Sequence, residues 1–120
     1  MAGKILVVDD DAEVREALGL NLSEEGYPVL TALNGAEALR VLEHETPALI
    51  LLDLTMPHMD GQAFWEHLQR TKPDIAVVVI SAVGHRAPKG LAVLEKPIDF
   101  ERLMDHVRQH CGSPDAVRAG

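Results

Sequence analysis

Short apolar runs alternate with segments of helical periodicity along almost the whole chain, and this alternation limits the possible folds more than any other feature. Runs of four or five apolar residues have the length of a strand and are typical of strands buried on both faces. The segments between them place apolar residues three and four positions apart, as amphipathic helices do. Strands that alternate with helices predict an α/β fold with a parallel sheet. The five expected strands are residues 4–8, 28–32, 48–52, 76–80 and 91–94.

Capping residues mark the expected ends of the helices. Asn34 precedes a helical segment and Glu37 follows it by three residues, which resembles the spacing of a capping box. Asp60 and Asp99 are expected to cap the third and the last helix, and Gly26 is expected to end the first. Residues 83–90 contain too few apolar positions for a helix that packs on a sheet. We therefore expect the fourth helix to be shortened or missing.

These elements predict a doubly wound, flavodoxin-like sheet of five parallel strands in the order 2-1-3-4-5. A chain of 120 residues has the size of one domain. We expect this domain to span residues 1–111. Residues 112–120 show no periodicity and are expected to form a flexible tail.

Charge and composition exclude several classes of partner. The formal net charge is -8 and the eleven basic residues are scattered, so direct binding to nucleic acid is not expected. No apolar run is long enough to cross a bilayer and no signal peptide is recognisable, so we expect a cytoplasmic protein without membrane insertion. The single cysteine, Cys111, permits no internal disulfide, which fits a reducing compartment. We expect it to be a small buried residue.

Polar residues follow four of the five expected strands. Asp9 and Asp10 follow the first strand, Asp53 the third, Ser81 the fourth and Lys96 the fifth. Because the carboxyl ends of parallel strands meet at one edge of the sheet, these side chains are expected to converge. Strands one and three would be neighbours, which brings three carboxylates within reach of one small cation.

Three carboxylates that lie together need a compensating positive charge, and a hard divalent ion satisfies several oxygens at once. Mg²⁺ is the natural candidate because it prefers oxygen ligands and commonly pairs carboxylates with a phosphate. Lys96 could balance the charge of a phosphoryl group, and Ser81 could donate a hydrogen bond to one of its oxygens. Standing alone, the aspartates after the first strand would more simply be a solvated turn that caps the first helix.

Four segments together resemble the sequence blocks of response-regulator receiver domains. The resemblance covers about residues 4–111, and the order and spacing of the blocks make it specific. The blocks are VVDDD at 7–11, LLDLTMPHMDG at 51–61, VVVISA at 77–82 and EKPIDFERL at 95–103.

The resemblance implies a phosphorylation switch. Asp53 would take a phosphoryl group from a phosphohistidine of a sensor histidine kinase or phosphotransfer protein, or from a small donor such as acetyl phosphate. Asp10, Asp53 and the backbone carbonyl of Thr55 would hold Mg²⁺ directly, and Asp9 would hold it through water.

The same resemblance implies that Lys96 binds the phosphoryl oxygens and that Ser81 swings toward them as the switch. It also implies a cis peptide bond between Lys96 and Pro97. Such a protein assists its own phosphorylation and dephosphorylation without turning over a diffusible substrate, so it is not an enzyme in the usual sense. Its output would be contact with a downstream protein, which the sequence does not identify.

Two features depart from the family pattern, and both fall on the output side. Ser81 and Lys96 are 15 positions apart, which is about two helical turns shorter than is usual in the family. Val93 stands where the family usually has an aromatic switch residue. We therefore hypothesise that phosphorylation is retained while its readout is unconventional.

The sequence is less consistent with two other functions. A pseudo-receiver would keep the fold and bind partners without phosphorylation, but Asp10, Asp53, Ser81 and Lys96 are all present. A phosphatase with an aspartate nucleophile would need a second aspartate two residues after the first, where this chain has Thr55.

Three further polar or aromatic positions are expected to be structural. His106 and His110 are one helical turn apart but lack a third metal ligand, so an exposed helix face is expected. Trp65 is expected to be half exposed and to pack beneath a neighbouring loop.

Overall fold

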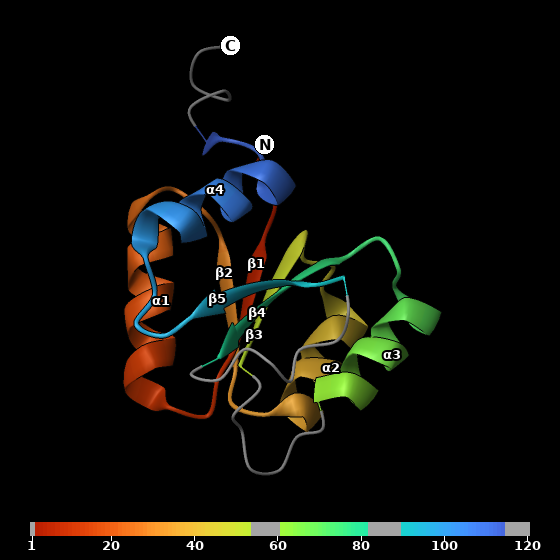
Figure 1. The fold of residues 1–120 in the computed structure, drawn as a ribbon. Helices are drawn as coiled ribbons and strands as arrows, with labels where there is room; N and C mark the ends of the chain where they lie inside the picture. Colours follow the sequence, from red (N-terminus) through yellow and green to blue (C-terminus); the bar gives the residue numbers. More distant parts are fainter. Residues whose placement is uncertain (1, 54–60, 82–89, 115–120) are drawn as a thin grey trace.

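A parallel five-stranded sheet lies between two layers of helices, in the computed structural model that describes residues 2–53, 61–81 and 90–114 (Figure 1). Helices α1 and α4 cover one face of the sheet, and α2 and α3 cover the other. The strand order is β2-β1-β3-β4-β5. The strands are β1 (Ile5–Val8), β2 (Val29–Ala32), β3 (Leu49–Asp53), β4 (Ala76–Ser81) and β5 (Ala92–Glu95), and the helices are α1 (Ala12–Glu24), α2 (Gly35–His44), α3 (Gly61–Thr71) and α4 (Phe100–Cys111).

The predicted fold class and strand order are confirmed. Every observed strand begins and ends within one residue of its predicted position. The prediction succeeded because the central strands β1 and β3 are buried at every residue, so that they read as continuous apolar runs. The prediction of a shortened or missing fourth helix falls on the connection between β4 and β5, most of which lies outside the described residues.

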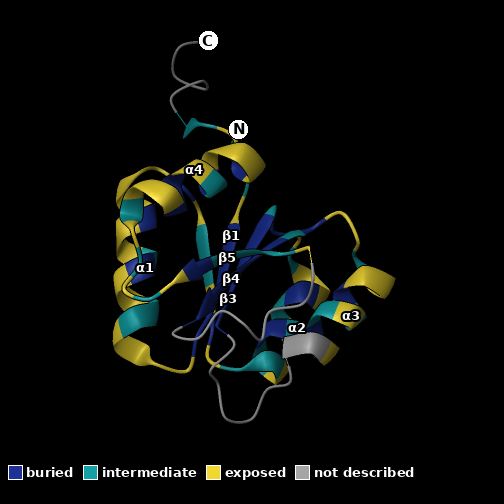
Figure 2. Cartoon of the chain, viewed as in Figure 1, coloured by how far each residue is buried: buried dark blue, intermediate teal, exposed yellow. Residues whose placement is uncertain are grey.

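Two apolar layers hold the sheet, one on each face (Figure 2). Alternate residues of each strand point to opposite faces, so Leu51 joins the layer under α1 and α4 while its neighbour Leu52 joins the layer under α2 and α3. Trp65 packs at the margin of the second layer and is half-buried, as predicted. Phe100 is also only half-buried, at the start of α4.

Helices α1, α2 and α4 are capped by the side chains of Asp11, Asn34 and Asp99. Asn34 Oδ1 accepts a hydrogen bond from the Glu37 amide at 2.8 Å, and Asp99 Oδ1 accepts one from the Glu101 amide at 2.9 Å, so both predicted caps are confirmed. The Glu37 carboxylate accepts from the amide of Leu33, one residue before the cap. The predicted cap Asp60 lies outside the described residues.

Hydrogen bonds to the end of the α4 segment close the edge of the sheet at which the strands begin. The Gly3 amide donates to the Cys111 carbonyl at 2.8 Å, and the Tyr27 hydroxyl donates to the Gly112 carbonyl at 2.7 Å. Gly26, which has a φ of 97° as a left-handed residue after α1, lies against Pro114. Cys111 is buried, as predicted. Residues 112–114 of the predicted tail therefore contact the domain, and residues 115–120 are outside the described part.

Candidate functional site

The register of the sheet places the candidate residues at one edge. Val8 pairs with Leu52 between β1 and β3, so that Asp9 and Asp53 are the next residues of two adjacent strands. Ser81 ends β4 and pairs with Glu95, the residue before Lys96. The predicted convergence at the carboxyl ends of the strands is therefore present in the fold.

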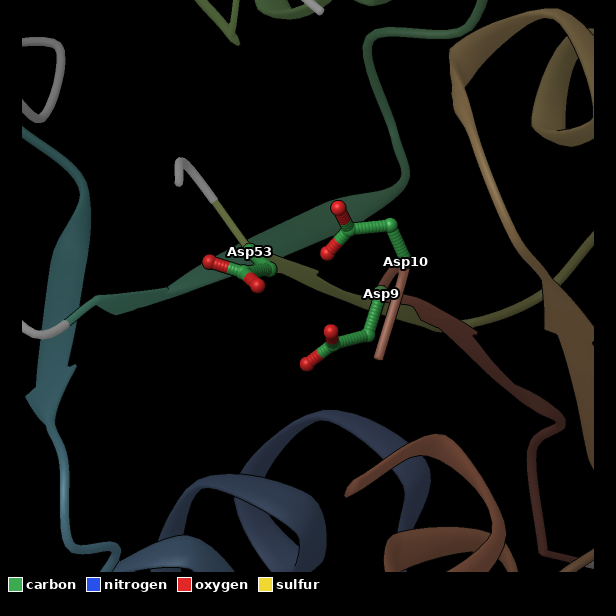
Figure 3. Close-up of side chains that lie close together, drawn as sticks. All are labelled: Asp9, Asp10 and Asp53. Atoms are coloured by element: carbon green, nitrogen blue, oxygen red, sulfur yellow. The ribbon is translucent and has the colours of Figure 1, made fainter. Parts of the chain in front are cut away.

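Three carboxylates from two strands meet at this edge (Figure 3). One oxygen of each of Asp9, Asp10 and Asp53 lies within 4.8 Å of the others. Asp9 and Asp53 are each only 1% exposed, whereas Asp10 is exposed and its side chain points toward Asp53. The cluster therefore has a buried floor and an open side.

Asp9 is held on several sides but keeps one carboxylate oxygen without a hydrogen bond. Its amide donates to the Ala32 carbonyl at 3.1 Å, and its Oδ1 accepts from the Asp11 amide at 2.9 Å. Its Oδ2 is buried and accepts no hydrogen bond from the described residues. Burying a carboxylate oxygen without a hydrogen-bond donor is costly, so this atom favours a positive charge close to it.

Lys96 places a positive charge next to the buried carboxylates of Asp9 and Asp53. Its Nζ lies 3.3 Å from Asp53 Oδ2 and 3.9 Å from Asp9 Oδ2. Its backbone amide donates to the Ser81 carbonyl at 3.1 Å, which ties the end of β5 to the end of β4. The Lys96–Pro97 peptide bond is cis, as predicted.

One lysine does not neutralise the buried carboxylates. The pKa of Asp9 is raised from 3.8 to about 6, chiefly by burial and further by the negative charge of Asp53 and a hydrogen bond with it. The Asp11 amide and Lys96 act in the opposite direction. At neutral pH the negative charge of the three carboxylates therefore exceeds the positive charge of Lys96.

This arrangement fits a small divalent cation. The donors are carboxylate oxygens, one of them buried and without a hydrogen bond, and Mg²⁺ prefers oxygen donors of this kind. Thr55, whose carbonyl was predicted as a further ligand, lies outside the described residues. Among the residues that the structure describes, this aspartate trio is the one group that could supply three metal ligands. His106 and His110 do not belong to such a group.

One residue of the site was missed by sequence reasoning. Arg15, in the first turn of α1, donates from Nη1 to the backbone carbonyl of Asp9 at 2.8 Å. A sequence signal did exist, because Arg15 is the only basic residue between Lys4 and Arg40.

Comparison with known proteins identifies the family. The model of the response regulator receiver domain matches residues 5–108, and the chain belongs to this family. It is 39% identical to the transcriptional regulatory protein GlrR of Escherichia coli over 107 residues, which cover 82% of this chain and 24% of that protein. It is 38% identical to the response regulator MprA of Mycobacterium ulcerans, with 90% of this chain and 50% of that protein covered. The chain thus spans a quarter to a half of these relatives.

Solved receiver structures share the fold. The response regulator TrrA of Thermotoga maritima, crystallised in complex with Mg²⁺ and BeF, superposes with a TM-score of 0.80 at 31% identity. That match covers 89% of this chain and 97% of TrrA. The chemotaxis protein CheY4 of Vibrio cholerae matches with a TM-score of 0.80 at 25% identity, with 92% and 99% covered. The chain is therefore a receiver domain of the kind found in two-component systems.

None of the described helices combines the length and the apolar character that a membrane span requires.

Proposed function

We propose that this receiver domain is a phosphoacceptor switch in which Asp53 is phosphorylated with the help of Mg²⁺. The observation that carries the proposal is the environment of the Asp53 carboxylate. Its carboxylate is buried, lies 3.3 Å from Lys96 Nζ, and adjoins a buried Asp9 oxygen that accepts no hydrogen bond from the described residues. A buried carboxylate between a lysine and further carboxylates suits the binding of a cation and a phosphoryl group together.

Phosphorylation would proceed by in-line displacement. A carboxylate oxygen of Asp53 attacks phosphorus, a new O–P bond forms, and the P–N bond of a phosphohistidine breaks as the imidazole leaves with its electron pair. With acetyl phosphate the bond that breaks is P–O, and acetate leaves. Lys96 would neutralise charge on the phosphoryl oxygens, and the hydroxyl of Ser81 would donate to one of them.

The metal would be held by Asp10, Asp53 and the backbone carbonyl of Thr55, with Asp9 contributing through water. When bound, Mg²⁺ supplies charge neutralisation for the entering phosphoryl group. Asp9 supports this role through its buried Oδ2, which accepts no hydrogen bond from the described residues and lies 3.9 Å from Lys96 Nζ, so that a closer cation would be favourable.

The partner that supplies the phosphoryl group would be a sensor histidine kinase or a phosphotransfer protein. TrrA, which shares 31% identity with this chain, has been crystallised with the histidine kinase ThkA, and that match covers 97% of TrrA. We propose a cytoplasmic location, a receiver unit of residues 1–111 with a C-terminal tail at 112–120, and an output through contact with another protein. The switch would assist its own phosphorylation and dephosphorylation and would not act as an enzyme on a diffusible substrate.

Intact mass after incubation with Mg²⁺ and acetyl phosphate tests the proposal. The wild type should gain one phosphoryl group, and the adduct should be lost on treatment with hydroxylamine, which cleaves acyl phosphates. Asp53→Asn should gain none. Asp105→Asn, which removes an exposed aspartate on α4, is the matched control and should be phosphorylated like the wild type. A wild type that neither binds Mg²⁺ nor gains mass would contradict the proposal and favour a pseudo-receiver that works by contact alone.

A further inference from the structure

Arg15 forms a hydrogen bond with a backbone carbonyl and not with a neighbouring carboxylate. It lies in a stretch rich in carboxylates, with Asp11, Glu13 and Glu16 as near neighbours in sequence. The ion pairs found among the described residues nevertheless do not include Arg15. Its half-buried side chain instead donates from Nη1 to the Asp9 carbonyl at 2.8 Å. A guanidinium that donates a charge-assisted hydrogen bond to a backbone carbonyl restrains the direction of that carbonyl.

The carbonyl of Asp9 belongs to the peptide that joins Asp9 to Asp10. Because a peptide unit is planar, the direction of its carbonyl sets the plane in which the next residue begins. The other contacts of Asp9 hold its amide, through Ala32, and its Oδ1, through the Asp11 amide. Of these contacts, the one with Arg15 holds the carbonyl of the Asp9–Asp10 peptide, and it acts together with the Asp11 contact on how the chain leaves β1 and on where the exposed Asp10 carboxylate points.

The same helix turn completes the arrangement. Asp11 caps α1 by accepting hydrogen bonds from the amides of Glu13 and Val14, and its own carbonyl accepts from the Arg15 amide at 2.9 Å. Arg15 is thus anchored by its backbone to the residue that follows Asp10 and by its side chain to the residue that precedes it. The two contacts therefore hold the backbone on both sides of Asp10.

We infer that Arg15 is a positioning residue for the magnesium site, which acts by fixing the Asp9–Asp10 peptide. This inference rests on the proposed function, because it assigns Arg15 a role toward the metal proposed there. Two opposite effects of removing Arg15 on Mg²⁺ affinity can be expected. As a bare positive charge, Arg15 repels Mg²⁺, and its removal should tighten binding. As a positioning residue, its removal should weaken binding about 10-fold, the lower end of the effect of groups that orient metal ligands.

Magnesium binding by calorimetry distinguishes these expectations in three folded variants. Arg15→Met removes the donor and the charge while keeping an unbranched chain, and should weaken Mg²⁺ binding about 10-fold. Arg15→Lys keeps a donor and the charge, and should recover most of the affinity. Arg40→Met removes one exposed positive charge on α2 and is the matched control, with affinity unchanged. Arg15→Gln, which is shorter than arginine, is a second test variant if Arg15→Met does not fold, and should show the same weakening.

Hydrogen exchange of the metal-free proteins gives a readout that does not depend on Mg²⁺. The amides of Asp10 and Asp11 should exchange faster in Arg15→Met than in Arg40→Met, because the peptide before them has lost its anchor. Wild-type or tighter Mg²⁺ affinity in Arg15→Met would overturn the inference while leaving the proposed function intact. A wild type that binds no Mg²⁺ would refute the proposed function, and unchanged exchange at these two amides would then refute the role of Arg15 as well.

Discussion

The two edges of the sheet are built for different purposes, although the same five strands form both. At the edge where the strands begin, polar groups are paired: the buried Tyr27 donates to the Gly112 carbonyl, and the half-buried Gly3 donates to the carbonyl of the buried Cys111. At the edge where they end, Asp9 and Asp53 are buried side by side, and Asp9 Oδ2 accepts no hydrogen bond from the described residues. The hydrogen bonds at the first edge stabilise the folded state, whereas the buried carboxylates at the second edge destabilise it in the absence of a cation. A receiver domain thus concentrates its electrostatic cost where its chemistry is proposed.

The largest expected effect is a stabilisation of the metal-free protein by Asp9→Asn. The pKa of Asp9 is raised from 3.8 to about 6, so the folded protein binds this proton more tightly than the unfolded chain does. The contribution to stability is fully present below about pH 4 and is lost as the pH rises through about 6. At pH 8 the substitution should therefore raise the free energy of unfolding by at most about 3 kcal/mol, since one pKa unit corresponds to about 1.4 kcal/mol.

Urea unfolding in EDTA at pH 5 and pH 8 measures this effect. The gain from Asp9→Asn should be larger at pH 8 than at pH 5. The exposed control Asp105→Asn should change stability by no more than about 0.5 kcal/mol at either pH. A gain that is equal at both pH values would show that burial of the Asp9 charge is not the cause.

Magnesium should produce the next largest effect, and only at the edge where the strands end. At a concentration 10 to 100 times its Kd, Mg²⁺ should stabilise the wild type by about 1 to 3 kcal/mol through binding to the folded state. Asp9→Asn should reduce this increment, because it removes a negative charge from the site. Thermal unfolding with Mg²⁺, with EDTA and with Ca²⁺ checks the prediction, and an increment that survives Asp53→Asn together with Asp9→Asn would place the metal elsewhere.

The smallest expected effect lies at the opposite edge. Tyr27→Phe removes the hydroxyl that donates to Gly112 and leaves the ring in the core, so it should destabilise the protein by about 1 kcal/mol. Exchange of the amides of Gly112 and Ser113 should become faster. The increment from Mg²⁺ should be the same as in the wild type. A change in that increment would mean that the two edges are coupled, which would break the comparison drawn above.

The sequence predicted the sheet well because parallel strands buried on both faces leave a plain apolar signal. It also predicted which polar residues converge, since residues that follow adjacent strands must share an edge: Asp9, Asp53, Ser81 and Lys96 lie where the strand order places them. Only their roles stay predictions. Thr55 and most of the connection between β4 and β5, where a helix is predicted to be shortened or missing, lie outside the described residues, so those two expectations remain predictions.

The sequence did not predict contacts that depend on the direction of a single group. The hydrogen bond from Tyr27 to Gly112 joins residues 85 positions apart and leaves no periodic signal. Likewise, an arginine in an acidic helix is most simply read as a partner of nearby carboxylates, whereas Arg15 contacts a backbone carbonyl. The burial of Asp9 without a second hydrogen-bonded oxygen was equally hidden, because it follows from the packing of the whole edge.

The strand order also has a consequence for the folding pathway. Ile5 pairs with Leu49, 44 positions along the chain, whereas Val78 pairs with Ala92 across only 14. Closing the longer loop costs about 1 kcal/mol more in chain entropy, so the pairing of β1 with β3 should be among the later ones to form. Asp9 and Asp10 follow one of these strands and Asp53 ends the other, so the cation site exists only once this pairing is made. Mg²⁺ should then slow unfolding and leave the rate of folding almost unchanged, which makes the metal a reporter of a late step in assembling the sheet.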